Sequence, residues 1–308
     1  MRNLTEHSLT GAVLEKLAGA RDERFKQIMA SLIRHLHAFV RDVEPTEAEW
    51  REGIRFLTAT GQKCDDKRQE YILLSDTLGV SMLVDAINHR KPDGASESTV
   101  LGPFYVSDAP ELPNGANIAE GVEGEPAYFC GRVRSTDGTP IPGAKLDIWS
   151  TDGQGWYDVQ REGAGLRARG RIRADGQGRY AFWTVKPVSY PIPTDGPVGK
   201  MLLRMGRHPY RPAHTHMIVS APAYQGVTTH LFVEEDPYLE SDAVFAVKNS
   251  LVVPFVRHDP GLAPDGRHME QPYFTVGYDF VLVPDRASAA IGQVDADHPA
   301  RQGSPGST

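Results

Sequence analysis

Two pairs of histidines stand two residues apart in this sequence, and the pattern around each pair decides what chemistry it could perform. His214 and His216 lie in RPAHTHMIVSA, a segment that is typical of a β-strand. Side chains two positions apart on a strand project from the same face, so these imidazoles could bind one metal ion together. His35 and His37 lie in a helical pattern, where a spacing of two turns the side chains roughly 200° apart, so they cannot share a ligand.

The spacing of His214 and His216 leaves the identity of a metal open, and also leaves open that there is none. A carboxylate could complete a two-histidine site for zinc or Fe(II), and the chain has 40 Asp and Glu residues. The alternative is a pair of histidines on the half-buried face of a sheet. Cys64 and Cys130 have neither metal nor redox spacing, so a cysteine-ligated zinc site and a disulfide framework are not expected.

Three segments resemble, in this order, the metal-binding motifs of the intradiol ring-cleavage dioxygenases. The segment DIWSTDGQGWYD at 147–158 is similar to the one that supplies the first tyrosine ligand in that family. TVKPVSYPIPTDGPVG at 184–199 is similar to the one that supplies the second, and Arg-Pro-Ala-His-x-His at 211–216 matches the histidine signature. The similarity runs from about residue 20 to about residue 283, which is most of the chain.

The resemblance implies one Fe(III) per chain, held by two tyrosinates and two histidines. The four metal ligands expected from it are Tyr157, Tyr190, His214 and His216. Fe(III) is a hard cation that favours anionic oxygen, and a trivalent ion can remove a phenol proton whose pKa is otherwise about 10. Two tyrosinates and one hydroxide would neutralise Fe(III), which suits a buried site. Without the family resemblance, both tyrosines would be interpreted as ordinary packing aromatics.

The same resemblance implies catalytic roles for Tyr190 and Arg211. Tyr190 is expected to leave the metal when a substrate diol binds and to accept one of the diol protons. Arg211 is expected to stabilise negative charge on the aromatic ring, and its alternative role is a surface salt bridge. Catalysis of this kind uses the metal as a Lewis acid and template, and the expected product is a muconate-type diacid.

The substrate expected from the resemblance is hydroxyquinol, benzene-1,2,4-triol, with catechol or a chlorocatechol as the alternative. STVLGPFYV at 98–106 resembles the hydroxyquinol-cleaving branch, and His230 stands where catechol-cleaving relatives usually have glutamine. The stretch 71–85 is expected to roof the pocket, with Leu73, Asp76, Val80 and Val84 on one face. An aspartate on an apolar face needs a partner or a purpose. The residues expected to contact the substrate are Leu73, Asp76, Val100, Leu101, Gly102, Pro103 and His230.

The first hundred residues are predicted to be helical. Apolar residues recur every three or four positions from Phe25 to Val40, and Pro45 ends that pattern. Thr46-x-x-Glu49 is a capping box that predicts the start of a second helix. A third helical stretch is predicted from roughly Lys67 to Asn88, and its apolar composition indicates that it is buried.

After the break KPDGASE at 91–97, the pattern changes to short β-branched and aromatic runs separated by Gly, Pro and Asp turns, without helices between them. We therefore expect an α+β fold, a helical N-terminal region packed on a C-terminal β-sandwich, with the site between them. The domains expected are a helical dimerisation and cap domain at 1–105 and a catalytic sandwich at 106–285. The tail at 286–308, rich in Ala, Gly, Ser and Pro, is predicted to be disordered.

Composition narrows the partners. The net charge of −7 argues against nucleic acid, and no run is apolar enough to span a membrane or to act as a secretory signal, so a cytoplasmic location is expected. Apolar residues on the N-terminal helices exceed what one short domain can bury, which predicts a homodimer. The resemblance also implies dimerisation there, in some members with a bound phospholipid. Two alternatives of other classes are a non-catalytic β-sandwich binding module and a zinc hydrolase.

Overall fold

The computed structural model describes residues 2–65, 68–161, 163 and 165–285, so the predicted tail at 286–308 lies outside the described residues. The chain divides into two compact units, Met1–Gln62 and Lys63–Thr308. Helices precede a strand-rich region, which confirms the α+β class. The helices between residues 70 and 88 group with the strand-rich unit. The predicted domain boundary near residue 105 stays a prediction.

The first unit consists of α1 (Leu9–Glu15), a short 3-10 turn, α2 (Glu23–Val43) and α3 (Glu47–Gln62). The predicted capping box is confirmed, because Thr46 N–H donates to Glu49 Oε2 at 2.8 Å and Glu49 N–H donates to Thr46 Oγ1 at 3.3 Å. The apolar stripe of α2 is exposed in this chain. Its large exposed residues are Phe25, Ile28, Leu32, Leu36, Phe39, Val40 and Val43.

The prediction of one buried helix from about Lys67 to Asn88 is wrong. The segment forms two helices, α4 (Glu70–Thr77) and α5 (Val80–Asn88), which are separated at Gly79. Gly79 has φ +73°, a left-handed conformation that ends one helix and lets the next begin in a new direction. Because of this break, Val80 and Val84 are 48% and 53% exposed and do not share the face of Leu73 and Asp76.

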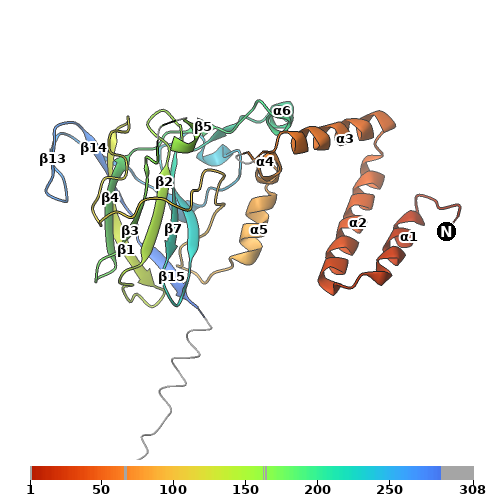
Figure 1. The fold of residues 1–308 in the computed structure, drawn as a ribbon, viewed down its shortest axis with the longest axis horizontal. Coiled ribbons are helices and arrows are strands. Elements are labelled where there is room, and N and C mark those ends of the chain that lie inside the picture. The colour runs from red at the N-terminus through yellow and green to blue at the C-terminus, as the bar shows by residue number, and fades with distance from the viewer. Residues whose placement is uncertain (1, 66–67, 162, 164, 286–308) are drawn as a thin grey trace, which may run out of the picture. The chain divides into compact units, whose positions relative to one another are not determined.

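Two sheets form a β-sandwich in the second unit (Figure 1). The first sheet has β1 (Pro126–Ser135) at its centre. β1 pairs with β4 (Arg179–Val185), and also with the successive strands β14 (Tyr273–Gly277) and β15 (Phe280–Pro284). Two short strands complete the sheet. Those short strands are β11 (Val256–His258) and β8 (Tyr224–Gln225). The second sheet has five strands, in the order β10 (Val252–Val253), β9 (Val227–Val233), β7 (His214–Ser220), β2 (Lys145–Ser150) and β3 (Arg169–Arg173).

The core of the sandwich lies between the two sheets and shows which face of the second sheet remains for chemistry. Met217 and Val219 of β7 pack into that core with Phe129 and Phe182 of the first sheet. Since side chains alternate along a strand, His214 and His216 project from the opposite face of β7. The cross-strand partners of His216 are Trp149 on β2 and His230 on β9, so both lie on that opposite face.

A helix interrupts the predicted run of strands. α6 (Pro197–Arg204) lies between the paired strands β5 (Tyr190–Pro191) and β6 (Tyr210–Arg211), so the expectation of no helices in this region is wrong. Pro197 suits the first turn of a helix, where its missing N–H is not needed. The helix spans only eight residues, too few for a clear periodicity in the sequence.

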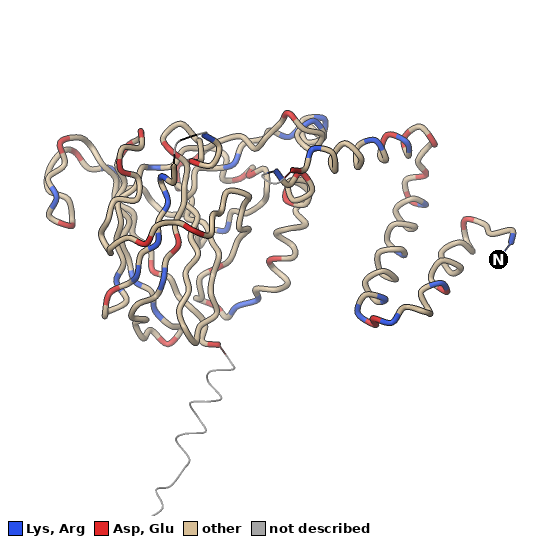
Figure 2. The backbone as a smooth tube through the Cα atoms, viewed as in Figure 1, with Lys and Arg blue, Asp and Glu red and all other residues tan. Residues whose placement is uncertain are grey.

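Charged residues of both signs occur in both units. Lys and Arg residues are interspersed with Asp and Glu along the described backbone (Figure 2). Within the described ranges, no helix is both long enough and apolar enough to cross a membrane.

Candidate metal centre

Four side chains from three separate segments converge on one point in the structure. Nε2 of His214 lies 3.1 Å from Nε2 of His216, and His216 Nε2 lies 2.9 Å from the hydroxyl of Tyr157. The hydroxyl of Tyr190 lies 3.2 Å from that of Tyr157 and 3.5 Å from His214 Nε2. These are the four predicted ligands, and the fold brings all of them together.

Tyr157 is held by a loop that a buried ion pair anchors. The next residue, Asp158, receives two hydrogen bonds from the guanidinium of Arg169, one of them 2.7 Å long, and both side chains are 2% exposed. Arg169 also donates to the carbonyl of Phe104 at 3.1 Å, and the Phe104 ring stacks on Tyr157 with centroids 4.4 Å apart. Arg169 therefore connects the Tyr157 loop to the segment that covers it.

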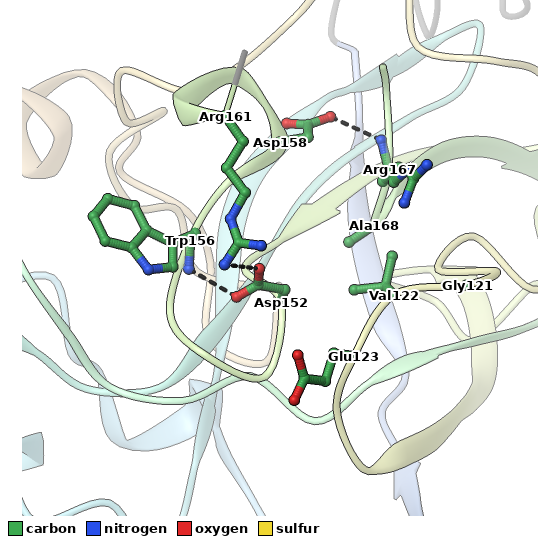
Figure 3. Close-up of a pocket in the computed structure, with 9 residues that line it drawn as sticks. All are labelled: Gly121, Val122, Glu123, Asp152, Trp156, Asp158, Arg161, Arg167 and Ala168. Atoms are coloured by element: carbon green, nitrogen blue, oxygen red, sulfur yellow. Dashed lines mark hydrogen bonds and ion pairs between the residues drawn. The ribbon is translucent and has the colours of Figure 1, made fainter. Parts of the chain in front are cut away.

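Figure 3 shows a pocket beside this loop, where Arg161 pairs with Asp152 and the backbone N–H of Arg167 donates to Asp158. A surface pocket of about 230 Å³ lies there. It is lined by none of the predicted site residues, so it is separate from the candidate site.

Tyr190 is positioned by pairing between two very short strands. β5 places Tyr190 directly opposite Arg211 of β6. Tyr190 is 7% exposed and lines a cavity of about 180 Å³, whereas Tyr157 is fully buried. A small molecule in the cavity can therefore reach Tyr190 more readily than Tyr157.

The second nitrogens of both histidines have partners that orient the rings. His214 Nδ1 lies 2.6 Å from the carbonyl oxygen of Pro212, so it carries the proton and leaves a lone pair on Nε2. His216 Nδ1 lies 2.8 Å from His230 Nε2, and His230 Nδ1 lies 3.1 Å from the hydroxyl of Thr99. In the tautomer that leaves His216 Nε2 free for a metal, His216 donates to His230, and His230 in turn donates to Thr99.

Burial sets the protonation of these groups. It lowers the pKa of His214, His216 and His230 well below the usual value, with the charge of Arg211 contributing for all three, so the imidazoles are neutral and able to act as ligands. Burial also raises the pKa of the Tyr157 phenol well above its usual value, and the neighbouring Tyr190 adds to that effect. Ionising Tyr157 therefore requires a strong nearby positive charge.

The donor geometry fits a metal ion. An ion bound about 2.0–2.2 Å from each donor leaves neighbouring donors about 2.8–3.6 Å apart at angles near 90–110°. Five of the six donor–donor distances within the set lie between 2.9 and 3.5 Å. Two imidazole lone pairs that face each other at 3.1 Å repel unless a cation lies between them, which makes a metal the natural occupant. A second set of possible ligands, His214, His216 and His230, also lies within 4.8 Å among the described residues.

Arg211 stands at the edge of the four donors. Its Nη1 lies 3.2 Å from His214 Nε2, and its side chain is 4% exposed, so the alternative of a surface salt bridge is wrong. Burial acts to lower the pKa of Arg211, but the carboxylate of Asp242 and the neighbouring tyrosines outweigh it and raise the pKa. Arg211 is thus a permanent buried cation that faces the cavity.

The cavity beside the donors is lined by most of the residues expected to contact a substrate. Leu73, Asp76, Val100, Gly102 and Pro103 all line it, together with Tyr190 and Arg211. Sequence reasoning did not identify the other lining residues, which include Phe104, Gln160, Ile192 and Val244. They come from four separate segments, and only the fold assembles them.

Two of the expected substrate residues do not line the cavity. Leu101 is 42% exposed, and the cavity is lined by its neighbours Val100 and Gly102. His230 is fully buried, and it packs against His216 with the rings perpendicular and their centroids 4.1 Å apart. The structure therefore favours a role for His230 through His216 over a direct contact with substrate.

A cavity beside a convergent group of two phenols and two imidazoles, on the outer face of a β-sandwich, is the arrangement expected of an enzyme that binds a small molecule beside a metal ion. Comparison with known proteins identifies the class. Residues 100–284 match the family model described as "Dioxygenase", and residues 22–96 match the one described as "Catechol dioxygenase N terminus". The chain belongs to the intradiol ring-cleavage dioxygenase family.

Its relatives include proteins named as hydroxyquinol and catechol dioxygenases. The chain is 52% identical, over 88% of its length and 92% of the relative, to hydroxyquinol 1,2-dioxygenase of Rhizobium sp.. It is 49% identical to 6-chlorohydroxyquinol 1,2-dioxygenase of Cupriavidus pinatubonensis, over 92% of this chain and 99% of that one. The crystal structure of hydroxyquinol 1,2-dioxygenase from Pseudomonas putida superposes with a TM-score of 0.86 at 50% identity, covering 91% of this chain and 99% of that chain. Catechol 1,2-dioxygenase of Acinetobacter radioresistens superposes with a TM-score of 0.80 at 26% identity, with 99% and 98% covered.

Proposed function

We propose that this chain is an Fe(III)-dependent dioxygenase that cleaves hydroxyquinol with O2 between its two adjacent hydroxyl groups. The product is 3-hydroxy-cis,cis-muconate, or its tautomer maleylacetate, in the degradation of aromatic compounds. The observation that carries the proposal is the convergence of two tyrosine hydroxyls and two histidine Nε2 atoms beside a cavity that contains Asp76 and Arg211. Two phenol oxygens favour a hard trivalent ion such as Fe(III) over zinc.

Within the proposed site, the roles of the protein groups follow from their positions. Bound Fe(III) supplies Lewis acidity that draws electron density from the diol and makes the ring reactive toward O2. Tyr190 borders the cavity, so as a phenolate it would be placed to give way to an incoming diol oxygen and to take up a diol proton. Arg211 compensates negative charge on the bound ring, while the apolar walls of Leu73 and Val100 exclude water and strengthen that attraction.

Asp76 supports hydroxyquinol over catechol as the substrate. It is a 7% exposed carboxylate in the cavity wall, and burial raises its pKa, while Ser81 and the charge of Arg211 act to lower it. A third substrate hydroxyl could donate to this carboxylate, a charge-assisted bond worth about 1.5–3 kcal/mol. The relatives named for hydroxyquinol are 46–52% identical to this chain, and the catechol 1,2-dioxygenase of Candida albicans is 37% identical. Catechol or a chlorocatechol remains the alternative substrate.

The test combines metal analysis, the visible spectrum and oxygen uptake. The purified protein is expected to contain one iron per chain, to be coloured by a ferric tyrosinate band, and to consume one O2 per hydroxyquinol. Tyr157→Phe and Tyr190→Phe are each expected to shift the band. The matched control is Tyr180→Phe, because the Tyr180 hydroxyl is buried in the sandwich, where it donates to the carbonyl of Tyr278.

Three outcomes would contradict this proposal in different ways. A colourless zinc protein that hydrolyses esters would support the hydrolase alternative instead. If both site variants kept the parent band and full activity, the assignment of Tyr157 and Tyr190 as ligands would be wrong. An iron protein that preferred catechol would overturn the substrate and leave the reaction class intact.

We further propose that the chain acts as a cytoplasmic homodimer that associates through its N-terminal helices, with space for a phospholipid between them. The exposed apolar stripe of α2 supports this, because a single chain rarely leaves such a surface open to water. Sedimentation analysis should find a dimer for the full chain and a monomer for a chain that lacks residues 1–60. A truncated chain that stayed dimeric would contradict this interface, and mass spectrometry of a solvent extract would detect the lipid.

A further inference from the structure

Arg211 is a buried cation that lines the cavity at the proposed site, and Asp242 makes most of its contacts. Nε of Arg211 donates to Asp242 Oδ1 at 3.2 Å, and Nη2 lies 3.5 Å from Oδ2. Nη1 points the other way, to His214 Nε2 at 3.2 Å. One edge of the guanidinium thus binds a carboxylate, which leaves the remaining nitrogen directed at the four donors.

The carboxylate of Asp242 is itself fixed by the backbone around it. The N–H of Val244 donates to Oδ1 at 3.3 Å, and the N–H of Ala246 donates to Oδ2 at 2.9 Å. The turn is tied down further, because Arg207 Nη2 donates to the carbonyl of Ala243 at 2.9 Å. Since the Asp242 side chain is only 2% exposed, water cannot replace these contacts. The carboxylate is therefore held in one position, where it accepts from Arg211.

A competitor for Arg211 lines the same cavity. Asp76 and Arg211 both border the cavity, yet in the described part of the chain Asp242 is the carboxylate within ion-pair distance of Arg211. In a water-poor cavity, a guanidinium without a partner is strongly drawn to any carboxylate nearby. If Asp242 lost its charge, Arg211 would turn toward Asp76, which would remove a cation from one end of the substrate and an acceptor from the other.

We infer that Asp242 is a positioning residue that keeps Arg211 directed at the metal-bound diol and keeps Asp76 free to accept the third hydroxyl of the substrate. This inference rests on the proposed function and deepens it. Asp242 touches neither the substrate nor the donors, because it acts through Arg211.

The first test is Asp242→Asn, which keeps the size of the side chain but replaces one carboxylate oxygen by a donor. We expect iron content to stay at the parent level and kcat/KM for hydroxyquinol to fall about a hundredfold, the usual effect of a misplaced catalytic group. The preference for hydroxyquinol over catechol should narrow, and the visible band of the anaerobic substrate complex should shift. Glu240→Gln is the matched control, since Glu240 is exposed in the same loop, and it should behave as the parent does.

A double-mutant cycle with Asp76→Ala tests the mechanism of the effect. If Asp242→Asn narrows the preference by releasing Arg211 to Asp76, it should not change the substrate ratio when Asp76 is absent. If Asp242 had a purely structural role, Asp242→Asn would lower kcat/KM for hydroxyquinol and catechol equally, with or without Asp76. That result would overturn the inference. Asp242→Glu is a second variant, should Asp242→Asn fail to fold. It keeps the charge but displaces it, so it should keep the substrate ratio and lower kcat about tenfold, and an unchanged kcat would overturn the inference.

Failure of this inference and failure of the proposed function are distinguishable in the same set of measurements. A parent protein without a ferric band or without diol cleavage would overturn the proposed function, and this inference with it. Suppose instead that the parent is coloured and active, and that Asp242→Asn has the parent's kcat, visible band and ratio of kcat/KM for hydroxyquinol and catechol. That outcome would overturn only the role of Asp242.

Discussion

Replacing His230 by leucine is expected to weaken metal binding, although His230 is not itself a proposed ligand. Its Nε2 lies 2.8 Å from Nδ1 of His216, and its Nδ1 lies 3.1 Å from the hydroxyl of Thr99. When His216 binds a metal through Nε2, its Nδ1 must carry a proton, and His230 is the group that accepts it. The contact fixes both the tautomer and the orientation of the His216 ring.

The magnitude follows from the burial of this hydrogen bond. His216 and His230 are 1% and 0% exposed, so His230→Leu leaves a donor buried without a partner, which costs about 1–3 kcal/mol. Loss of such a supporting contact lowers metal affinity about 10–100-fold, or roughly 1.4–2.7 kcal/mol. His230→Gln provides an amide oxygen that can still accept, so its loss of affinity should be at most about tenfold.

Iron affinity is measured by competition with a chelator, followed by the visible band of the protein. Thr229→Val is the matched control, because Thr229 is buried on the same strand with its side chain on the opposite face. The Thr229 hydroxyl has no hydrogen-bond partner among the described residues, so this change should leave iron binding intact. If His230→Leu bound iron as tightly as the parent and the control, the argument that His230 supports His216 would be refuted.

Three further predictions address selectivity, backbone conformation and pH. Asp76→Ala should retain iron but lower kcat/KM for hydroxyquinol about ten- to hundredfold relative to catechol, and an unchanged ratio of the two substrates would count against the assigned contact. Gly102→Ala should lower Tm and iron content, because Gly102 has φ +77° and an added Cβ would lie 2.9 Å from Cε1 of His216; parent-like values would contradict this. Burial depresses the pKa of His214, His216 and His230 in the folded protein. As the pH falls below about 6.5, these histidines therefore become protonated in the unfolded chain while they are still neutral in the folded one. Urea unfolding should therefore show stability decreasing on acidification, by up to about 1.4 kcal/mol per pH unit for each histidine, and constant stability from pH 7 to 5 would disprove it.

Local patterns in the sequence predicted the elements that carry the site. The strand pattern around His214 and His216 required both imidazoles to share a face, and they do, with Nε2 atoms 3.1 Å apart. The start of α3 was readable from its capping box, because caps act within one turn of the chain. The site tyrosines were recognisable only through family resemblance, since nothing in their immediate neighbours distinguishes a ligand from a packing residue.

Contacts between distant segments were beyond prediction from local patterns. His230 was expected at the substrate, but the register of β7 against β9 pairs it with His216. The ion pair of Asp158 with Arg169 joins residues of two segments, and neither has a sequence signal beyond its charge. The break at Gly79 was missed because a single glycine inside an apolar run is compatible with one continuous helix.

By itself, the sequence determined the chemical types available, the strand that pairs two histidines, the change from a helical to a strand-rich region, and the family. These follow from residue type and from spacing of a few positions, which backbone geometry converts directly into direction. The tertiary structure decided which sheet face holds the site, that Asp76 and Arg211 share one cavity, and that Asp242 forms an ion pair with Arg211. Such features depend on strand register and on which loops meet, and these are set by the packing of the whole sandwich core.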